Sequence, residues 1–132
     1  MADYTVVNLK EVEDAAPKFG LAPGVEARFA GPSLGLAHSG LSYQRLEPGF
    51  RVPFGHRHAE QEEIYIVLGG SAWIKLDDEI VELGPWDTVR VSNETMRGFE
   101  AGPDGVELLA FGAPKSGVAG SDAEIVQGWW TD

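Results

Sequence analysis

From residue 36 onward, short apolar runs alternate with turn residues, and this rhythm constrains the fold more than any other feature of the chain. The 17 glycines and 8 prolines among the 132 residues punctuate these runs, and such residues mark turns. Short runs rich in β-branched and aromatic side chains, bounded by turn signals, are typical of strands. The pattern therefore predicts an all-β domain, a sandwich or small barrel, rather than a helical bundle.

The expected strands are short and closely spaced. They cover residues 36–46, 64–68, 72–76, 80–83, 88–92, 97–100 and 106–112. One or two helical turns before Pro17 and an edge strand over 25–30 precede them. We therefore divide the chain into an N-terminal arm with an edge strand (1–35), a barrel (36–112) and a C-terminal tail (113–132) that packs on the barrel or on a partner.

Composition excludes several classes of protein. The formal net charge is −11, from 21 acidic and 10 basic residues, and no basic cluster interrupts the acidic surface. Such a chain repels phosphate backbones and anionic lipids, so neither nucleic acid nor membrane is an expected partner. The absence of cysteine excludes disulfides and thiolate metal sites. Because no apolar run approaches the roughly 20 residues needed to span a bilayer, a soluble cytoplasmic protein is expected.

Residues 49–70 hold a pattern with chemical meaning, because two of the three histidines lie there, one residue apart. Alternate residues of a strand point to the same face, so His56 and His58 can aim both imidazoles into one cavity. A turn into the next strand can bring Glu63 to the same point. Two imidazoles and one carboxylate suit a divalent ion such as Fe, Mn, Ni, Cu or Zn. The alternative is a surface turn that happens to be rich in histidine and glutamate.

This stretch resembles the first conserved motif of the cupin superfamily, in which a glycine, a His-x-His pair, a glutamate and a closing glycine follow one another at set spacings. Gly49 is followed by six residues before His56, one more than usual, whereas four residues separate His58 from Glu63 and six separate Glu63 from Gly70. The resemblance covers roughly residues 36–112. It implies a single-domain cupin-type antiparallel β-barrel, a jelly roll, with these two histidines and Glu63 as metal ligands.

Glu62 is a rival for the role of Glu63, because the shorter spacing is also allowed and Gly69 would then close the motif. We prefer Glu63, since the ligand carboxylate of cupins usually stands immediately before the apolar strand. Strand alternation then places Tyr65 and Val67 on the same inner face. Tyr65 becomes a candidate for hydrogen bonding or proton transfer in catalysis.

The second cupin motif, whose histidine is the fourth metal ligand, survives here in its spacing and in flanking residues that resemble the usual ones, but its diagnostic residues are replaced. Fifteen residues, 71–85, separate the two motifs, as in cupins. The replaced positions are Trp86 for Gly, Ser92 for Pro, Glu94 for Gly, Arg97 for His and Ala101 for Asn.

Arg97 leaves two interpretations open, because arginine stays protonated and cannot ligate a cation. In the first, His56, His58 and Glu63 still hold a metal, and Arg97 clamps an anionic substrate group such as a carboxylate or phosphate. In the second, no metal binds, and Arg97 pairs with Glu63 in place of the metal, since a buried carboxylate needs a countercharge.

Three further residues carry weaker signals. His38 can supply the missing fourth ligand if its strand passes the site, although a partly exposed, hydrogen-bonded role is favoured. Trp129 and Trp130 are too apolar to leave in water, so we expect them to pack on the barrel or on a second subunit.

Three functions remain open. The first is a small-molecule enzyme with a mononuclear metal, for dioxygenase, isomerase, cyclase or lyase chemistry, in which Tyr65 and Arg97 are the catalytic candidates. The second is a metal-free module that binds an acidic or sugar-like ligand without catalysis. The third is a scaffold protein whose terminal tryptophans make the contact. The resemblance also implies a homodimer.

Overall fold

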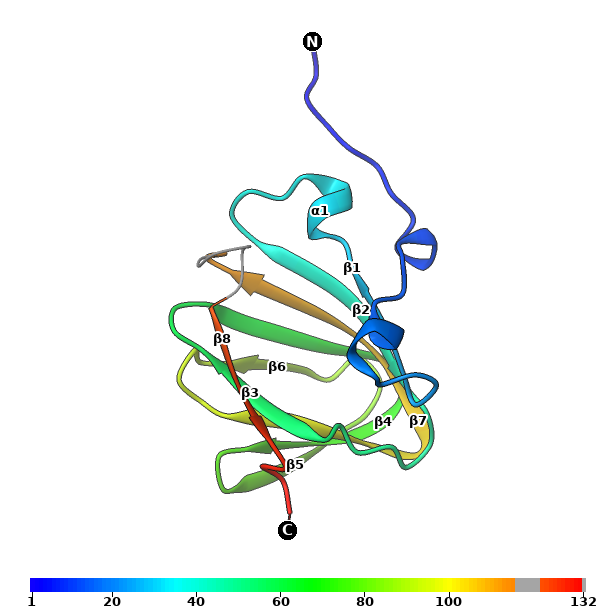
Figure 1. The fold of residues 1–132 in the computed structure, drawn as a ribbon, viewed down its shortest axis with the longest axis vertical. Coiled ribbons are helices and arrows are strands. Elements are labelled where there is room, and N and C mark those ends of the chain that lie inside the picture. Colours follow the sequence, from blue (N-terminus) through cyan, green and yellow to red (C-terminus); the bar gives the residue numbers. More distant parts are fainter. Residues whose placement is uncertain (116–121, 132) are drawn as a thin grey trace.

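The computed structural model describes residues 1–115 and 122–131 and confirms the predicted all-β antiparallel barrel (Figure 1). The part of the predicted tail at residues 116–121, together with residue 132, lies outside the described residues. Two short 3-10 helices, one helical turn and a set of antiparallel strands follow one another along the chain. They are η1 (Leu9–Glu11), η2 (Ala16–Phe19), β1 (Val25–Phe29), α1 (Gly31–Leu34), β2 (Gly40–Leu46), β3 (Phe54–His58), β4 (Glu62–Leu76), β5 (Glu79–Leu83), β6 (Thr88–Val91), β7 (Arg97–Ala113) and β8 (Ala123–Gln127).

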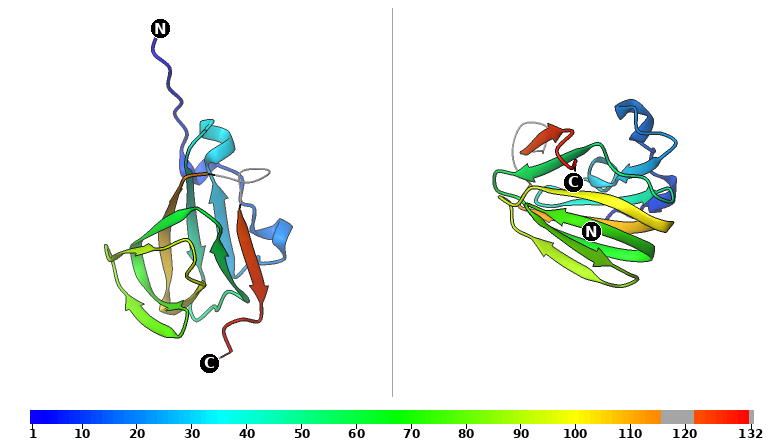
Figure 2. Two further views of the ribbon diagram at one scale, coloured as in Figure 1. Left: turned by 90° about the vertical axis from the view of Figure 1, so that its left-hand side faces the viewer. Right: turned by 90° about the horizontal axis from the view of Figure 1, so that it is seen from below.

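Two long strands, β4 and β7, hold the barrel together. They pair with each other along most of their length. The first half of β4 also pairs with β6 and its second half with β5, whereas β7 pairs with β2 near its end and with β3 at its start. Strand β8 pairs with β3, and Figure 2 shows all these strands curling around one interior.

The sequence predicted β4 and β7 as two strands each, over 64–68 and 72–76 and over 97–100 and 106–112, and this division was wrong. The glycines that suggested strand ends instead bend two continuous strands, with register shifts between Val67 and Gly69 and between Gly70 and Ala72. A bulge lets a strand turn a corner while its ladder continues. The strand predicted over 36–46 begins later, at Gly40, because residues 36–39, which follow α1, contain a bend.

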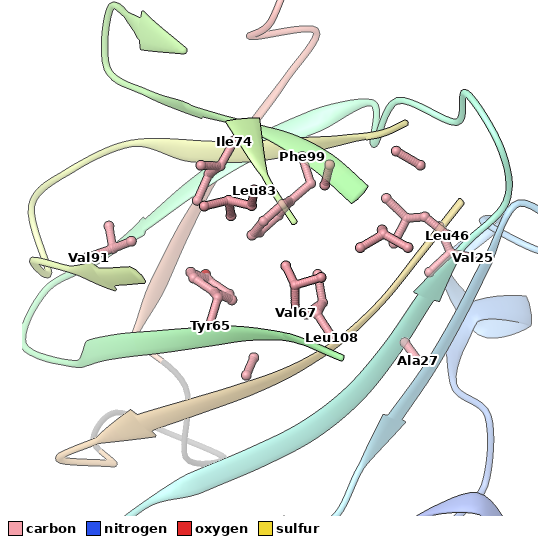
Figure 3. Close-up of a cluster of buried hydrophobic side chains, with 14 of the residues drawn as sticks. Val25, Ala27, Leu46, Tyr65, Val67, Ile74, Leu83, Val91, Phe99 and Leu108 are labelled. Carbon is pink, nitrogen blue, oxygen red and sulfur yellow. The ribbon is translucent and has the colours of Figure 1, made fainter. Parts of the chain in front are cut away.

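Apolar side chains from the inner faces fill the barrel (Figure 3). Val67, Ile74 and Leu108 are completely buried. Among the described residues, the buried polar or charged side chains are Ser42, His58, Gln61 and Arg97. A buried charge is costly unless an opposite charge or a hydrogen bond compensates it. The groups that contact His58 and Arg97 are therefore described below.

The described part of the C-terminal tail folds back onto the barrel. Strand β8 lies beside β3, and Trp130 is 7% exposed (Figure 1). Trp129 lies over Gly55 so closely that a Cβ added to this glycine would come 2.4 Å from the indole. The Lys75 ammonium stands 4.9 Å from the centre of the Trp129 ring, a cation–π contact. The tail therefore packs against β3 through Trp129, which also reaches Lys75 of β4.

Replacing Trp129 by Ala is expected to lower the free energy of unfolding by about 1–2 kcal/mol, because a half-buried indole loses its packing on the barrel. Urea unfolding followed by circular dichroism measures this change. Trp86→Ala is the matched control, since Trp86 is 73% exposed and its removal should change the unfolding free energy by less than about 0.5 kcal/mol. Equal costs for the two variants would contradict docking of the tail.

No helix within residues 1–115 and 122–131 combines the length and the apolar character that crossing a bilayer requires.

Candidate metal centre

Strand β3 presents both histidines of the His-x-His pair on one face, as strand alternation requires. The two ring centroids lie 5.2 Å apart, with the ring planes at 89°. The side chain of His56 is 24% exposed and that of His58 is 7% exposed. Both imidazoles thus border one largely buried space.

Strand β4 begins with the two rival glutamates, and the structure separates them. Glu63 has only 13% of its side chain exposed and points toward the histidines. Glu62 points the other way, 55% exposed, and pairs with Arg90 at 3.5 Å on the surface. The inward carboxylate is therefore Glu63, because alternate strand positions face opposite sides.

The three side chains converge on one point. Glu63 Oε1 lies 3.2 Å from Nε2 of His56 and 3.2 Å from Nε2 of His58. One candidate ligand atom from each residue lies within 4.8 Å of the other two. Ligands about 2.1 Å from a shared ion at tetrahedral angles stand about 3.4 Å apart. Both carboxylate–imidazole separations therefore fit a common ion.

The second ring nitrogen of His58 meets a carboxylate from the far end of the chain. His58 Nδ1 lies 2.7 Å from Asp122 Oδ1. The Nε2 atom of the same ring is buried and has no hydrogen-bond partner, although Glu63 Oε1 is near. If Nδ1 carries the proton, the lone pair of Nε2 faces a carboxylate oxygen, and a cation between them relieves the repulsion.

Sequence reasoning missed Asp122, which precedes β8. Its carboxylate accepts hydrogen bonds from the backbone amides of Glu60 at 2.6 Å and Gln61 at 3.2 Å. Burial alone would raise the pKa of Asp122, but the hydrogen bonds from the Glu60 amide, His58 and the Gln61 amide lower it to about 2. No local pattern could have found this residue, because it stands 64 positions after His58.

The electrostatics of the site centre on Glu63. Burial alone would raise the pKa of its carboxyl, but the two imidazoles 3.2 Å from Oε1, with the hydrogen bond from the Tyr65 hydroxyl, hold that pKa well below its usual range. Burial would lower the pKa of His58, and its contacts with Glu63 and Asp122 outweigh burial and raise it. Glu63 is therefore an anion at neutral pH, as a metal ligand must be.

No protein-family model and no curated protein matches the sequence. Among solved structures, a cupin protein from Bacteroides fragilis is 26% identical, covers 86% of this chain and 86% of its own, and superposes with a TM-score of 0.71. The chain belongs to the cupin superfamily. The match covers 86% of this chain, so the cupin family inferred from the sequence is confirmed.

Two further solved cupins share the fold at lower identity. A sugar phosphate isomerase from Silicibacter pomeroyi is 21% identical, with 82% of this chain and 74% of its own covered and a TM-score of 0.65. Pac13 from Streptomyces, a nucleoside dehydratase, is 18% identical, with 96% of this chain and 92% of its own covered and a TM-score of 0.70. The cupin fold thus carries several chemistries, and fold alone selects none of them.

Arg97 of this cupin lies inside the protein rather than at a surface that a substrate can reach. Its side chain is 0% exposed. The guanidinium donates hydrogen bonds to the backbone carbonyls of His56 at 3.3 Å and Ser92 at 3.1 Å. Its Nε atom stands 3.9 Å from Glu63 Oε1 and makes no hydrogen bond. Of the two interpretations that the sequence left open for Arg97, this placement is less suited to a substrate clamp and better suited to a pairing with Glu63.

Tyr65 likewise turns toward Glu63. Its hydroxyl donates a hydrogen bond of 2.5 Å to Glu63 Oε1, and its ring packs edge-on against Phe99 at 4.9 Å. Burial, with the charge of Glu63, raises the pKa of Tyr65 well above its usual range, so the hydroxyl keeps its proton. The residue can therefore orient the carboxylate, whereas its predicted role in proton transfer stays a prediction.

His38 does not reach the site. It lies in an exposed bend before β2, and its backbone carbonyl accepts a hydrogen bond from the Lys115 amide at 2.8 Å. The structure groups His56, His58 and Glu63 without it. The strand that would have carried His38 past the site starts only at Gly40, which explains the difference.

Proposed function

We propose that this cupin holds one divalent transition-metal ion through His56, His58 and Glu63 and acts on a small-molecule substrate. The buried Nε2 atom of His58 carries the argument. It has no hydrogen-bond partner and lies 3.2 Å from Glu63 Oε1, and Nε2 of His56 lies 3.2 Å from the same oxygen. When the His58 proton is on Nδ1, beside Asp122, Nε2 is an acceptor without a donor in the interior. Such an arrangement is costly, and a cation offsets that cost.

Two imidazoles and a carboxylate suit Fe, Mn, Ni, Cu or Zn, and three protein ligands leave positions open on such an ion. When bound, the ion would supply Lewis-acid activation of a substrate oxygen or of water. The residues of the chain supply the rest. Tyr65 orients Glu63 through its hydroxyl, and the Arg97 guanidinium, 3.9 Å away, offsets the negative charge of that carboxylate.

The reaction we propose is an isomerisation or an elimination of the lyase type. Solved cupins that resemble this chain include a sugar phosphate isomerase, a nucleoside dehydratase and an oxalate decarboxylase from Bacillus subtilis. The substrates of these proteins are small molecules, and two are anions. Because Arg97 is buried, an anionic substrate of this cupin would need the open positions of the metal rather than the guanidinium.

The homodimer and the cytoplasmic location stay predictions. Leu41, Ile64 and Phe111 occupy neighbouring positions on the outer face of β2, β4 and β7, and Phe111 is 42% exposed. This apolar face supports the predicted dimer, since large exposed apolar side chains favour association.

Metal analysis tests the proposal most directly. Protein purified without an affinity tag, or reloaded with Fe, Mn, Ni, Cu or Zn, is expected to hold close to one equivalent of metal by elemental mass spectrometry. His56→Ala should lose that metal, because it removes one of three ligands. His38→Ala is the matched control, since it removes an exposed histidine outside the site and should keep full occupancy. A wild type that holds none of these ions would refute the metal centre.

A metal-free binding module is the second candidate, and one observation favours it. The raised pKa of His58 allows an imidazolium between Glu63 and Asp122, which would satisfy the same atoms with a proton. Arg97 would then add the remaining positive charge near Glu63. In that case the folded protein binds none of the metals offered, and the binding of a small ligand without catalysis is the remaining function.

A further inference from the structure

We infer that Asp122 is a positioning residue of the metal centre and that the C-terminal strand β8 is part of that centre. The inference rests on the proposed function, because it concerns how His58 is presented to the ion.

Both oxygens of the Asp122 carboxylate are engaged. Oδ1 lies 2.7 Å from Nδ1 of His58, and Oδ2 accepts the backbone amides of Glu60 at 2.6 Å and Gln61 at 3.2 Å. Only 7% of the Asp122 side chain is exposed. A carboxylate held at both oxygens cannot rotate away, so it presents a fixed acceptor to His58.

That acceptor decides which nitrogen of His58 carries the proton. Both ring nitrogens face an ionised carboxylate, which accepts hydrogen bonds and donates none. Asp122 Oδ1 is the nearer, at 2.7 Å against 3.2 Å for Glu63 Oε1, and Glu63 Oε1 already accepts from the Tyr65 hydroxyl. The neutral ring therefore places its proton on Nδ1. The lone pair then belongs to Nε2, the buried atom that faces Glu63 and has no hydrogen-bond partner. Carboxylate partners of metal-bound histidines act in this way, and their loss typically weakens metal binding about 10–100-fold.

The strand pairing places Asp122 at this atom. Strand β8 pairs with β3 from Phe54 opposite Gln127 to His58 opposite Ala123, and Asp122 is the residue just before that ladder. A slip of one residue would carry the carboxylate away from His58 and reverse the face of every β8 side chain. The register of β8 is therefore a determinant of the metal site.

Glu124 offers a matched control on the same strand. Its carboxylate pairs with Arg57 at 2.7 Å on the outer surface, where its side chain is 57% exposed. Asp122→Asn and Glu124→Gln each remove one negative charge and keep the shape of the side chain. A difference between the two variants therefore reports the contact with His58 rather than the overall charge.

The test measures the affinity of the full chain for Zn²⁺ by competition with a chromophoric chelator. We expect Asp122→Asn to bind Zn²⁺ about 10–100-fold more weakly than the wild type and Glu124→Gln to stay within about twofold. Should Asp122→Asn fail to fold, Asp122→Ser keeps an acceptor for the two turn amides and is expected to show the same loss.

A second measurement separates positioning from a purely structural role. Nitrogen-15 spectra of the metal-free protein, at a pH where His58 is neutral, should show the proton on Nδ1 in the wild type and a growing Nε2–H form in Asp122→Asn. Weaker Zn²⁺ binding with an unchanged ring form would make Asp122 structural only and overturn the inference.

Two other outcomes also overturn the inference about Asp122, but they have different consequences for the proposed metal function. Wild-type affinity in Asp122→Asn would remove Asp122 from the centre while the proposed metal function stands. A wild type that binds no Zn²⁺, Fe²⁺, Mn²⁺, Ni²⁺ or Cu²⁺ would instead refute the proposed function itself.

Discussion

Arg97→Met is expected to lower the free energy of unfolding of the metal-free protein by about 3–5 kcal/mol, the cost of removing one partner of a buried ion pair. The guanidinium is fully buried and serves three groups at once, the carbonyls of His56 and Ser92 and the carboxylate of Glu63. Methionine fills much of the same volume but supplies neither donors nor charge. Urea unfolding in the presence of a chelator measures the change.

Arg90→Met is the matched control for this substitution. Arg90 pairs with Glu62 at 3.5 Å, but its side chain is 65% exposed, and an exposed pair contributes about 0–1 kcal/mol. The two variants make the same chemical change in opposite environments. If Arg97→Met costs no more than Arg90→Met, the guanidinium does not hold Glu63, and the electrostatic account of the site fails.

Gly70→Ala is expected to destabilise the protein by about 4 kcal/mol or to prevent folding. Gly70 has φ +73°, and an added Cβ would stand 2.0 Å from the backbone oxygen of Gly105. The left-handed conformation costs an L residue about 1–2 kcal/mol, and forcing two strands apart adds about 1–3 kcal/mol. The strain falls where β4 bends, seven residues after Glu63, so the variant should also weaken metal binding.

Gly35→Ala separates the two causes. Gly35 has a similar φ of +69°, but no atom lies within 4 Å of an added Cβ. This variant should therefore lose only the conformational part, about 1–2 kcal/mol, in urea unfolding. Equal losses for Gly70→Ala and Gly35→Ala would show that the close approach of β4 to β7 is not a tight constraint.

The prediction of the site from sequence worked where the chemistry is local. His56 and His58 share a face because they stand two apart on one strand, and Glu63 was preferred over Glu62 because it stands next to the apolar run. The side-chain period of a strand is fixed, so the spacing alone separates inner from outer positions. The structure brings these three residues together, as the spacing requires, while their binding of a metal stays a prediction.

The sequence was misleading where a pair of glycines can mark either a turn between two strands or a bulge within one strand. Gly69 and Gly70 suggested the end of one strand and the start of another, but they bend a single strand whose pairing with β7 continues. Glycine serves both a turn and a bulge, and the local pattern does not distinguish the two. Only the continuity of the partner strand decides between them.

Sequence by itself determined the fold class, the cupin resemblance and the inner face of β3 and β4, because these follow from alternation and spacing over a few residues. Only the tertiary structure decided the burial of Arg97 beside Glu63 and the contact of Asp122 with His58. Such contacts join segments up to 64 residues apart and depend on which strands pair and in which register. The balance of packing and burial over the whole barrel sets that register, and no short stretch of sequence carries it.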